Sequence, residues 1–150
     1  MKHEKYMTRA IELANNAYQQ DEVPVGCVIV FNDEIIGEGF NTREKDQHIF
    51  THAEVMAIKQ ANQRLKSWRL EECVLYVTLE PCLMCAGAIS QARIKTVFFG
   101  AQDHKAGAYG SIIDVSQIQQ LNHHTTVYGG LLKEECEEII KNYFKAKREL

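Results

Sequence analysis

The sequence lacks long apolar runs, a secretory signal and an excess of positive charge. No apolar run approaches the roughly 18 residues that a membrane-spanning helix requires, so no membrane association is expected. The amino terminus leads into a helical pattern and has no apolar segment that ends in small residues. The net charge of −3 argues against attraction of nucleic acid by the whole surface, although it leaves room for a local basic patch.

Internal repeats, low-complexity tracts and domain linkers are also absent, so the 150 residues are expected to form one domain. A domain of this size buries roughly 68–70% of its unfolded surface and needs no disulfide to be stable. The five cysteines are odd in number, and two of them stand in a Cys-x-x-Cys pattern. This usage indicates reduced thiols in a cytoplasmic protein.

Apolar periodicity predicts strands that alternate with helices through the middle of the chain. Helices are predicted over 2–20 and 53–62, from Pro81 onward, and at the carboxy terminus, where apolar residues from Leu132 to Tyr143 mark an amphipathic helix. Strands are predicted over 25–31, 34–40, 73–79, 96–100 and 125–128, and the first two should form an antiparallel hairpin. Residues 63–72 are expected to be irregular, and 112–121 to form a loop with a short helix. The pattern is typical of an α/β sandwich whose sheet is partly parallel.

The stretch Pro81-Cys82-Leu83-Met84-Cys85 directly follows a predicted strand and supplies two thiols. Pro81 suits the first position of a helix, where its missing N–H costs nothing, so a helix is predicted to begin there. Cys82 and Cys85 would then project from one face of the first turn and could bind one ion. The positive end of the helix dipole lowers the pKa of such thiols and favours the metal-binding thiolate.

His52 and Glu54 lie at the start of another predicted helix and add an imidazole and a carboxylate. One His with two Cys is the composition of a catalytic zinc site, in which three protein ligands leave the fourth position to water. A thioredoxin-like redox pair is the alternative for the two thiols alone. A closed structural zinc site would need a fourth ligand, for which Cys73 is the nearest thiol in sequence. The spacing of His52 and Glu54 favours the catalytic site.

Aromatic and basic residues gather at the end of the last predicted helix, at Tyr143, Phe144, Lys145, Lys147 and Arg148. Aromatic rings that stack on bases, next to cations that bind phosphates, are typical of RNA-binding surfaces. Because acidic residues crowd the beginning of the same helix, the helix dipole favours this distribution whatever its function. The segment is therefore a candidate RNA contact with an alternative structural explanation.

Together these residues resemble the bacterial tRNA-specific adenosine deaminases, members of the zinc-dependent cytidine deaminase superfamily, whose signature is His-x-Glu followed by Pro-Cys-x-x-Cys. Longer similar runs extend over nearly the whole chain and favour the tRNA-editing branch; they lie at 23–26, 37–41, 52–54, 76–88, 99–101 and 110–111. The resemblance implies a single zinc-dependent deaminase domain over residues 1–150. Its fold would be a three-layer α/β/α cytidine-deaminase-like fold with a central mixed five-stranded sheet flanked by helices.

The resemblance further implies hydrolytic deamination of adenosine to inosine at the wobble position of a tRNA anticodon, in an arginine tRNA, by a homodimer with one Zn²⁺ per subunit. His52, Cys82 and Cys85 would hold the metal. A zinc-bound hydroxide would attack C6 of the base, with Glu54 as the proton shuttle. The residues implied for substrate binding are Asn41, Val25, Ala53, Asp103 and Lys105. Those implied for RNA contact are Tyr143, Phe144, Lys145, Lys147 and Arg148.

Two other functions are compatible with the same residues. A small-molecule base or nucleoside deaminase, of the guanine or cytosine type, would use the same zinc centre without needing the basic tail. A non-enzymatic RNA-binding module with structural zinc would use the metal site only to hold its fold. If turnover requires a polymeric substrate, the first alternative is excluded. If turnover is lost when Glu54 is replaced, the second alternative is excluded.

Overall fold

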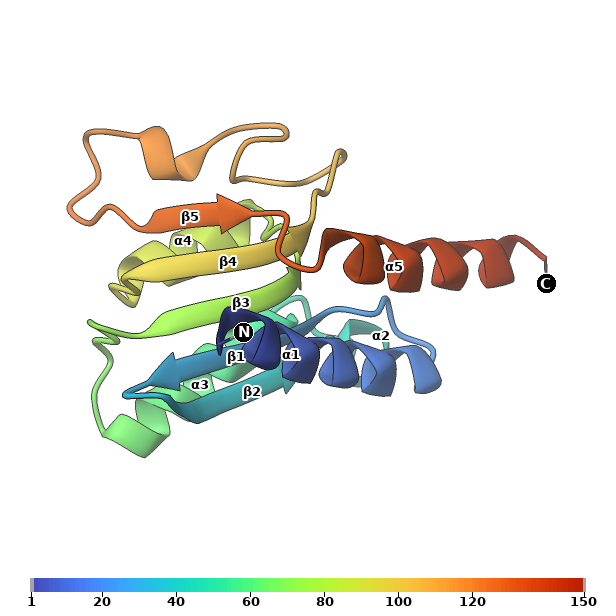
Figure 1. Cartoon of the computed structure of the whole chain (residues 1–150), viewed down its shortest axis with the longest axis horizontal. Helices are drawn as coiled ribbons and strands as arrows, with labels where there is room; N and C mark the ends of the chain where they lie inside the picture. Colours follow the sequence, from blue (N-terminus) through green and yellow to red (C-terminus); the bar gives the residue numbers. More distant parts are fainter. Residues whose placement is uncertain (1, 150) are drawn as a thin grey trace.

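The computed structural model describes residues 2–149 as a mixed five-stranded sheet flanked by helices (Figure 1). The helices are α1 (Lys2–Gln19), α2 (Arg43–Asp46), α3 (Ala53–Leu65), α4 (Leu83–Gln91) and α5 (Lys133–Arg148), with a 3₁₀ turn η1 (Val115–Gln117). The strands are β1 (Gly26–Phe31), β2 (Glu34–Phe40), β3 (Val74–Leu79), β4 (Thr96–Ala101) and β5 (Thr126–Gly129). Their order is β2-β1-β3-β4-β5, which confirms the predicted mixed sheet.

The sheet is antiparallel on one side and parallel on the other. β1 pairs antiparallel with both β2 and β3, whereas β3, β4 and β5 run parallel. Parallel strands require crossover connections, and α4 supplies the one between β3 and β4. The expected hairpin of β1 and β2 is present, and the expected short helix within 112–121 is η1.

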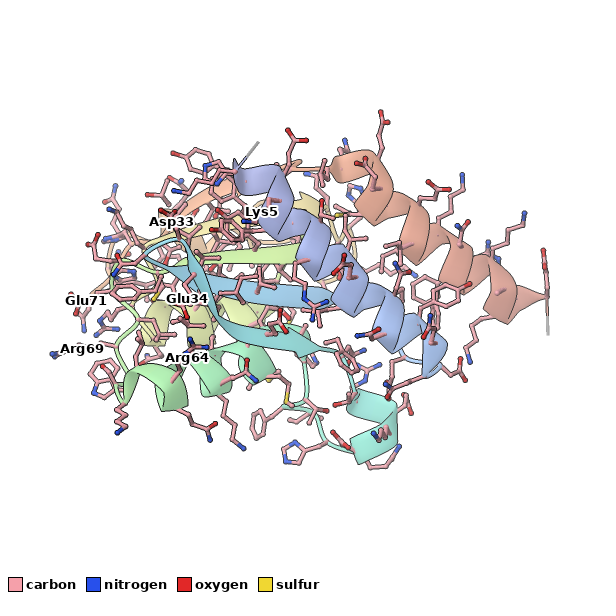
Figure 2. All side chains as sticks on the ribbon, turned by 60° about the horizontal axis from the view of Figure 1, so that its bottom comes forward. Lys5, Asp33, Glu34, Arg64, Arg69 and Glu71 are labelled. Atoms are coloured by element: carbon pink, nitrogen blue, oxygen red, sulfur yellow. The ribbon has the colours of Figure 1, made fainter. Side chains whose placement is uncertain are left out.

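The central strands are buried on both faces, which explains why they appear in the sequence as continuous apolar runs. In β1, Cys27 and Ile29 pack with the layer of α3 and α4, while Val28 and Val30 pack with the layer of α1. Successive strand residues point to opposite faces, so a single apolar run serves two cores. The two views agree that α1 and α5 lie on one face of the sheet and α3 on the other (Figures 1 and 2).

The close seating of α3 on β2 sets the position of its amino-terminal end. A Cβ added at Gly39 would lie 2.4 Å from the carbonyl oxygen of Ala53, so only glycine permits this contact. At the other end of the helix Arg64 forms an ion pair with Glu34, and Figure 2 shows the two side chains facing each other. The helix is thereby held along its length, with His52 just before its first residue.

Two predicted helix boundaries were wrong, and one short helix was missed. α4 begins at Leu83 rather than Pro81, because Cys82 has extended backbone angles and its carbonyl accepts the first helical bond, from Ala86. α3 continues to Leu65, beyond the predicted end at 62, and stops where Lys66 adopts a left-handed conformation. The polar segment after β2 contains the short helix α2, which was not predicted.

The carboxyl ends of β3 and β4 meet at one edge of the sheet, as parallel strands require. Residues 80–85 follow β3 and residues 102–111 follow β4 at that edge. Clefts beyond the carboxyl ends of parallel strands are the usual ligand sites of α/β sheets. α5 extends in the direction in which these strands point (Figure 1). Among residues 2–149, no helix is both long and apolar enough to cross a membrane.

Candidate metal and active site

His52, Cys82 and Cys85 converge at the carboxyl edge of β3. The imidazole Nδ1 of His52 lies 3.8 Å from the sulfur of Cys82 and 3.5 Å from that of Cys85. All three possible ligand atoms lie within 4.8 Å of one another, which is close enough to hold one metal ion. No fourth His, Cys, Asp or Glu joins this group in the described part of the chain, and Cys73 in particular lies outside it.

Each ligand stands at or just inside the start of a helix. His52 is the N-cap of α3, and Cys82 is the N-cap of α4. Cys85 is the third residue of α4, and the side chains of an N-cap and of the third helical residue face each other, as in a capping box. The two thiols therefore converge even though the helix starts two residues later than predicted.

The contact between the two thiols shifts their pKa values in opposite directions. A hydrogen bond from Cys85 lowers the pKa of Cys82 to about 4, against the opposing effect of burial. The same contact raises the pKa of Cys85, and burial raises it further. The hydrogen bond with Cys82 also raises the pKa of His52. Two sulfurs and an imidazole nitrogen are the donors that zinc prefers, so the residues fit a zinc ion, which displaces any thiol protons when it binds.

Glu54 lies inside the same site and is only 4% exposed. Burial raises the pKa of its carboxyl to about 7, with the Cys82 thiolate adding to the effect. A carboxyl with a pKa close to neutral can both accept and donate a proton at physiological pH. Because Glu54 is not part of the ligand group, its carboxyl is available for proton transfer.

A cavity of about 250 Å³ opens over this centre. Most of the residues predicted for metal binding, catalysis and substrate binding line it, namely Val25, Asn41, His52, Ala53, Glu54, Cys82 and Asp103. Cys85 is fully buried and does not line the cavity, and a ligand needs no solvent access. Lys105 does not line the cavity: it is exposed, and its backbone N–H donates to a carboxylate oxygen of Asp103. The fold thus brings together all the predicted substrate residues except Lys105.

Asn41 lines the cavity, and two hydrogen bonds hold its side-chain amide in place. Its NH₂ donates to the carbonyl oxygen of Val23 at 3.2 Å, and its oxygen accepts from the N–H of Arg43 at 3.1 Å. An asparagine side chain has two donor hydrogens and two acceptor lone pairs. These two bonds use one donor and one acceptor of the amide.

The sequence prediction missed three charged residues, of which Arg43 and Glu80 line the cavity and Glu22 does not. The positive charge of Arg43 acts to lower the pKa of His52. Glu22 is 1% exposed and accepts backbone hydrogen bonds from Glu44 and Lys45, at the start of α2. Glu80, also buried, binds the loop after β4. None of the three residues belongs to a periodic pattern in the sequence. The one available signal is that Glu80 directly precedes Pro81 of the cysteine motif.

The predicted RNA-contact residues of α5 fall into two groups. Tyr143 is 7% exposed, its hydroxyl donates to the carbonyl oxygen of Asp21, and its ring packs edge-on against Tyr18. Lys147 pairs with Asp21 at 2.6 Å, so both residues anchor α5 to the end of α1. The other three members, Phe144, Lys145 and Arg148, are exposed.

Comparison with protein families matches residues 1–148 to the MafB19-like deaminases. Among curated proteins, the tRNA-specific adenosine deaminase of Bacillus subtilis is 44% identical over 145 residues, covering 97% of this chain and 90% of that protein. The tRNA-specific adenosine deaminase of Haemophilus influenzae is 43% identical over 147 residues, covering 97% of this chain and 85% of that protein. The similarity therefore extends over nearly the full length of this chain and over most of each relative.

Comparison of the fold with solved structures points to the same family. A structure from work on A-to-I editing by tRNA:A34 deaminases at the wobble position superposes with a TM-score of 0.87 and 40% identity, covering 90% of this chain and 98% of that chain. The guanine deaminase of Nitrosomonas europaea superposes with a TM-score of 0.77 but only 22% identity, over 93% of this chain and 83% of that one, which indicates a shared fold alone. With the His-Cys-Cys group and the mixed sheet in place, the chain belongs to the tRNA-specific adenosine deaminase family of the cytidine deaminase-like superfamily.

Proposed function

We propose that this protein is a single zinc-dependent deaminase domain, over residues 1–150, that converts adenosine to inosine at the wobble position of a tRNA anticodon, in an arginine tRNA. The observation that carries the proposal is the joint placement of His52, Cys82, Cys85 and Glu54 at one cavity. The names of relatives at 43–44% identity support the RNA substrate. A redox role for the thiols is not favoured, because an imidazole and a buried carboxyl share their site.

His52, Cys82 and Cys85 would hold Zn²⁺, which when bound supplies a Lewis acid that brings the pKa of a water toward about 7. Glu54 accepts a proton from the attacking water, delivers it to N1 of the adenine, and passes a second proton to the departing amino group. Water and adenosine thereby give inosine and ammonia. Asn41 holds the nucleoside through its side-chain amide, with Val25 and Ala53 forming the adjacent walls.

Access to C6 requires an unstacked base, so the substrate is a loop nucleotide turned out into the cavity. Asp103 and Lys105, in the loop after β4, are proposed to lie along the neighbouring nucleotides. Lys105 is exposed beside the cavity rather than in its lining, which suits contact with a phosphate more than with the target base.

Two copies of the chain are proposed to assemble, as the resemblance implies. Large apolar side chains close to the site are exposed: Leu83 by 60%, Ile112 by 63% and Ile113 by 45%. The segments that carry them are joined by the bridge between Cys82 and Gly107 and by the hydrogen bond from Ile112 to Gly107. Exposed apolar surface of this kind is typical of a protein interface.

A cytoplasmic location is proposed on the basis that all five cysteines are free.

The function is tested by incubating the zinc-loaded protein with unmodified tRNA and, separately, with free nucleosides and bases. Inosine and ammonia are expected from tRNA, with turnover of adenosine, guanine and cytosine lower by at least about 100-fold, because only the polymer gains the binding energy of the flanking nucleotides. Inosine in the digested tRNA and released ammonia are the two readouts. Turnover of small substrates without tRNA would instead support the base or nucleoside deaminase.

The exposed end of α5 is proposed to contact the RNA backbone through Phe144, Lys145 and Arg148. The double variant Lys145→Glu/Arg148→Glu is expected to raise KM for tRNA about tenfold and to reduce the salt dependence of binding, because about two phosphate contacts are lost. Lys59→Glu/Lys66→Glu changes the net charge equally on exposed positions of α3 and its cap and serves as the control. Equal effects of the two double variants would remove α5 from the RNA interface.

A further inference from the structure

Glu80 carries a buried carboxylate, and neither metal binding nor proton transfer explains why it is there. It is 2% exposed and, among the ion pairs of residues 2–149, it has no cationic partner. Instead it accepts backbone N–H groups from Asp103 at 3.1 Å, Tyr109 at 2.9 Å and Ser111 at 3.2 Å. The hydroxyl of Ser111 donates a fourth hydrogen bond to it.

These four bonds use the full acceptor capacity of the group. An ionised carboxylate only accepts, and its two oxygens offer about four lone-pair sites. Hydrogen bonds to a charged group are stronger than those between neutral groups, and they replace the water that burial removes. All four donors belong to residues 103–111, hereafter the 103–111 loop, so one side chain holds this loop at both of its ends.

The backbone beside Glu80 extends the attachment. The N–H of Ala108 donates to the carbonyl oxygen of Pro81 at 2.8 Å, and Cys82 forms an isolated bridge with Gly107. A Cβ added at Gly107 would lie 2.3 to 2.5 Å from the carboxyl atoms of Glu80. Only glycine therefore lets the loop lie directly on the carboxylate.

The 103–111 loop forms one wall of the cavity through Asp103 and Ala106. Within residues 2–149, none of the hydrogen bonds of Glu80 reaches His52 or Glu54. We propose that Glu80 is a positioning residue for the RNA substrate, which holds the 103–111 loop against the segment that carries Cys82 and so shapes the cavity for the target nucleotide and its neighbours. This proposal rests on the function proposed above.

Binding of RNA to an inactive protein tests it without turnover. The parent is zinc-loaded Glu54→Ala, the probe is a stem-loop RNA with adenosine at the wobble position, and the readout is Kd from fluorescence anisotropy. Adding Glu80→Gln preserves the shape but turns one acceptor oxygen into an NH₂ donor that faces N–H groups. We expect Kd to rise at least about tenfold while one zinc per chain is retained. In the protein with Glu54 intact, KM should rise while kcat stays within about threefold.

Gly107→Ala disturbs the same contact from the side of the loop, and it is expected to raise Kd to a similar extent. Because both changes break one contact, the combination with Glu80→Gln should bind no more than about threefold more weakly than either alone. Ser111→Ala removes only the hydroxyl donor, and it should raise Kd about threefold. This milder variant tests the proposal if Glu80→Gln does not fold.

Ile94→Val is the control for lost stability, because it shortens a fully buried side chain two residues before β4, away from the carboxyl edge. It should lower Tm and leave Kd unchanged. The proposal is overturned if folded, zinc-loaded Glu80→Gln binds the RNA within twofold of its parent. It is also overturned if Ile94→Val weakens binding as much as Glu80→Gln does. If Glu80→Gln cannot fold, an unchanged Kd for Ser111→Ala overturns it. If Glu54→Ala itself does not bind the RNA, the proposed function fails, and this inference falls with it.

Discussion

Replacing Glu54 with alanine is expected to lower kcat for tRNA deamination by roughly 10²–10⁴-fold or more, since the side chain serves more than one proton transfer. The carboxyl is 4% exposed and lies beside the three candidate ligands without belonging to their group. Bound zinc should therefore stay at one per chain, and RNA affinity should change little. Single-turnover rates, zinc content by mass spectrometry and Kd measure the three quantities.

Glu54→Gln is the matched variant, because it keeps the shape and polarity of the side chain but cannot take up a proton. It should be as inactive as Glu54→Ala if proton transfer is the role of this residue. Activity retained by either variant would remove Glu54 from the mechanism. Such a result would favour the RNA-binding module with structural zinc.

Removal of a sulfur ligand is the second change that is expected to have a large effect. Cys85→Ala leaves His52 and Cys82 alone, and two protein ligands do not make a stable zinc site. The variant should lose bound zinc and all measurable deamination. Because a ligand that binds only the folded state stabilises it by about 2.7 kcal/mol at 100 times its Kd, added zinc should raise the Tm of the wild-type protein and not that of the variant.

Cys73→Ala is the control for this experiment. Its thiol is also fully buried, but it lies outside the cluster of possible ligands. The variant should keep its zinc and its activity and lose only packing. Zinc loss from Cys73→Ala would point to the closed four-ligand site that the arrangement of residues argues against.

Chelation should inactivate the wild-type protein in the same way, with recovery on addition of zinc. Cysteine binds zinc as the thiolate, so any proton on the two thiols must leave when the metal binds. Reloading should therefore release protons into a weakly buffered solution, which a pH indicator dye can follow together with the return of activity.

Local patterns explain why much of the architecture could be predicted. The apolar runs at β1 and β3 identify strands buried on both faces, and the 3.6-residue spacing in α1 and α5 identifies helices with one buried face. Boundaries were less predictable. Pro81 has the geometry of a first helical residue, yet α4 starts two residues later, because Cys82 takes the N-cap position that faces Cys85.

The metal and proton-transfer groups could also be predicted, because their chemistry depends on residue types at short spacings. His52 with Glu54, and Cys82 with Cys85, each stand within one helical turn. By contrast, the bonds between the 103–111 loop and Glu80 join residues 23 to 31 positions apart. No local pattern predicts such a contact, since it depends on the meeting of β3 and β4 at one edge.

The sequence by itself therefore determined the fold class, the ligand set of the candidate metal site and its proton-transfer residue. Only the tertiary structure decided that Tyr143 anchors α5 instead of facing solvent, that Lys105 lies outside the cavity, and that Glu80 supports its wall. The physical reason is that residue type and periodicity set local chemistry and burial. Which buried polar groups satisfy each other across the chain is settled only when the strands and helices pack.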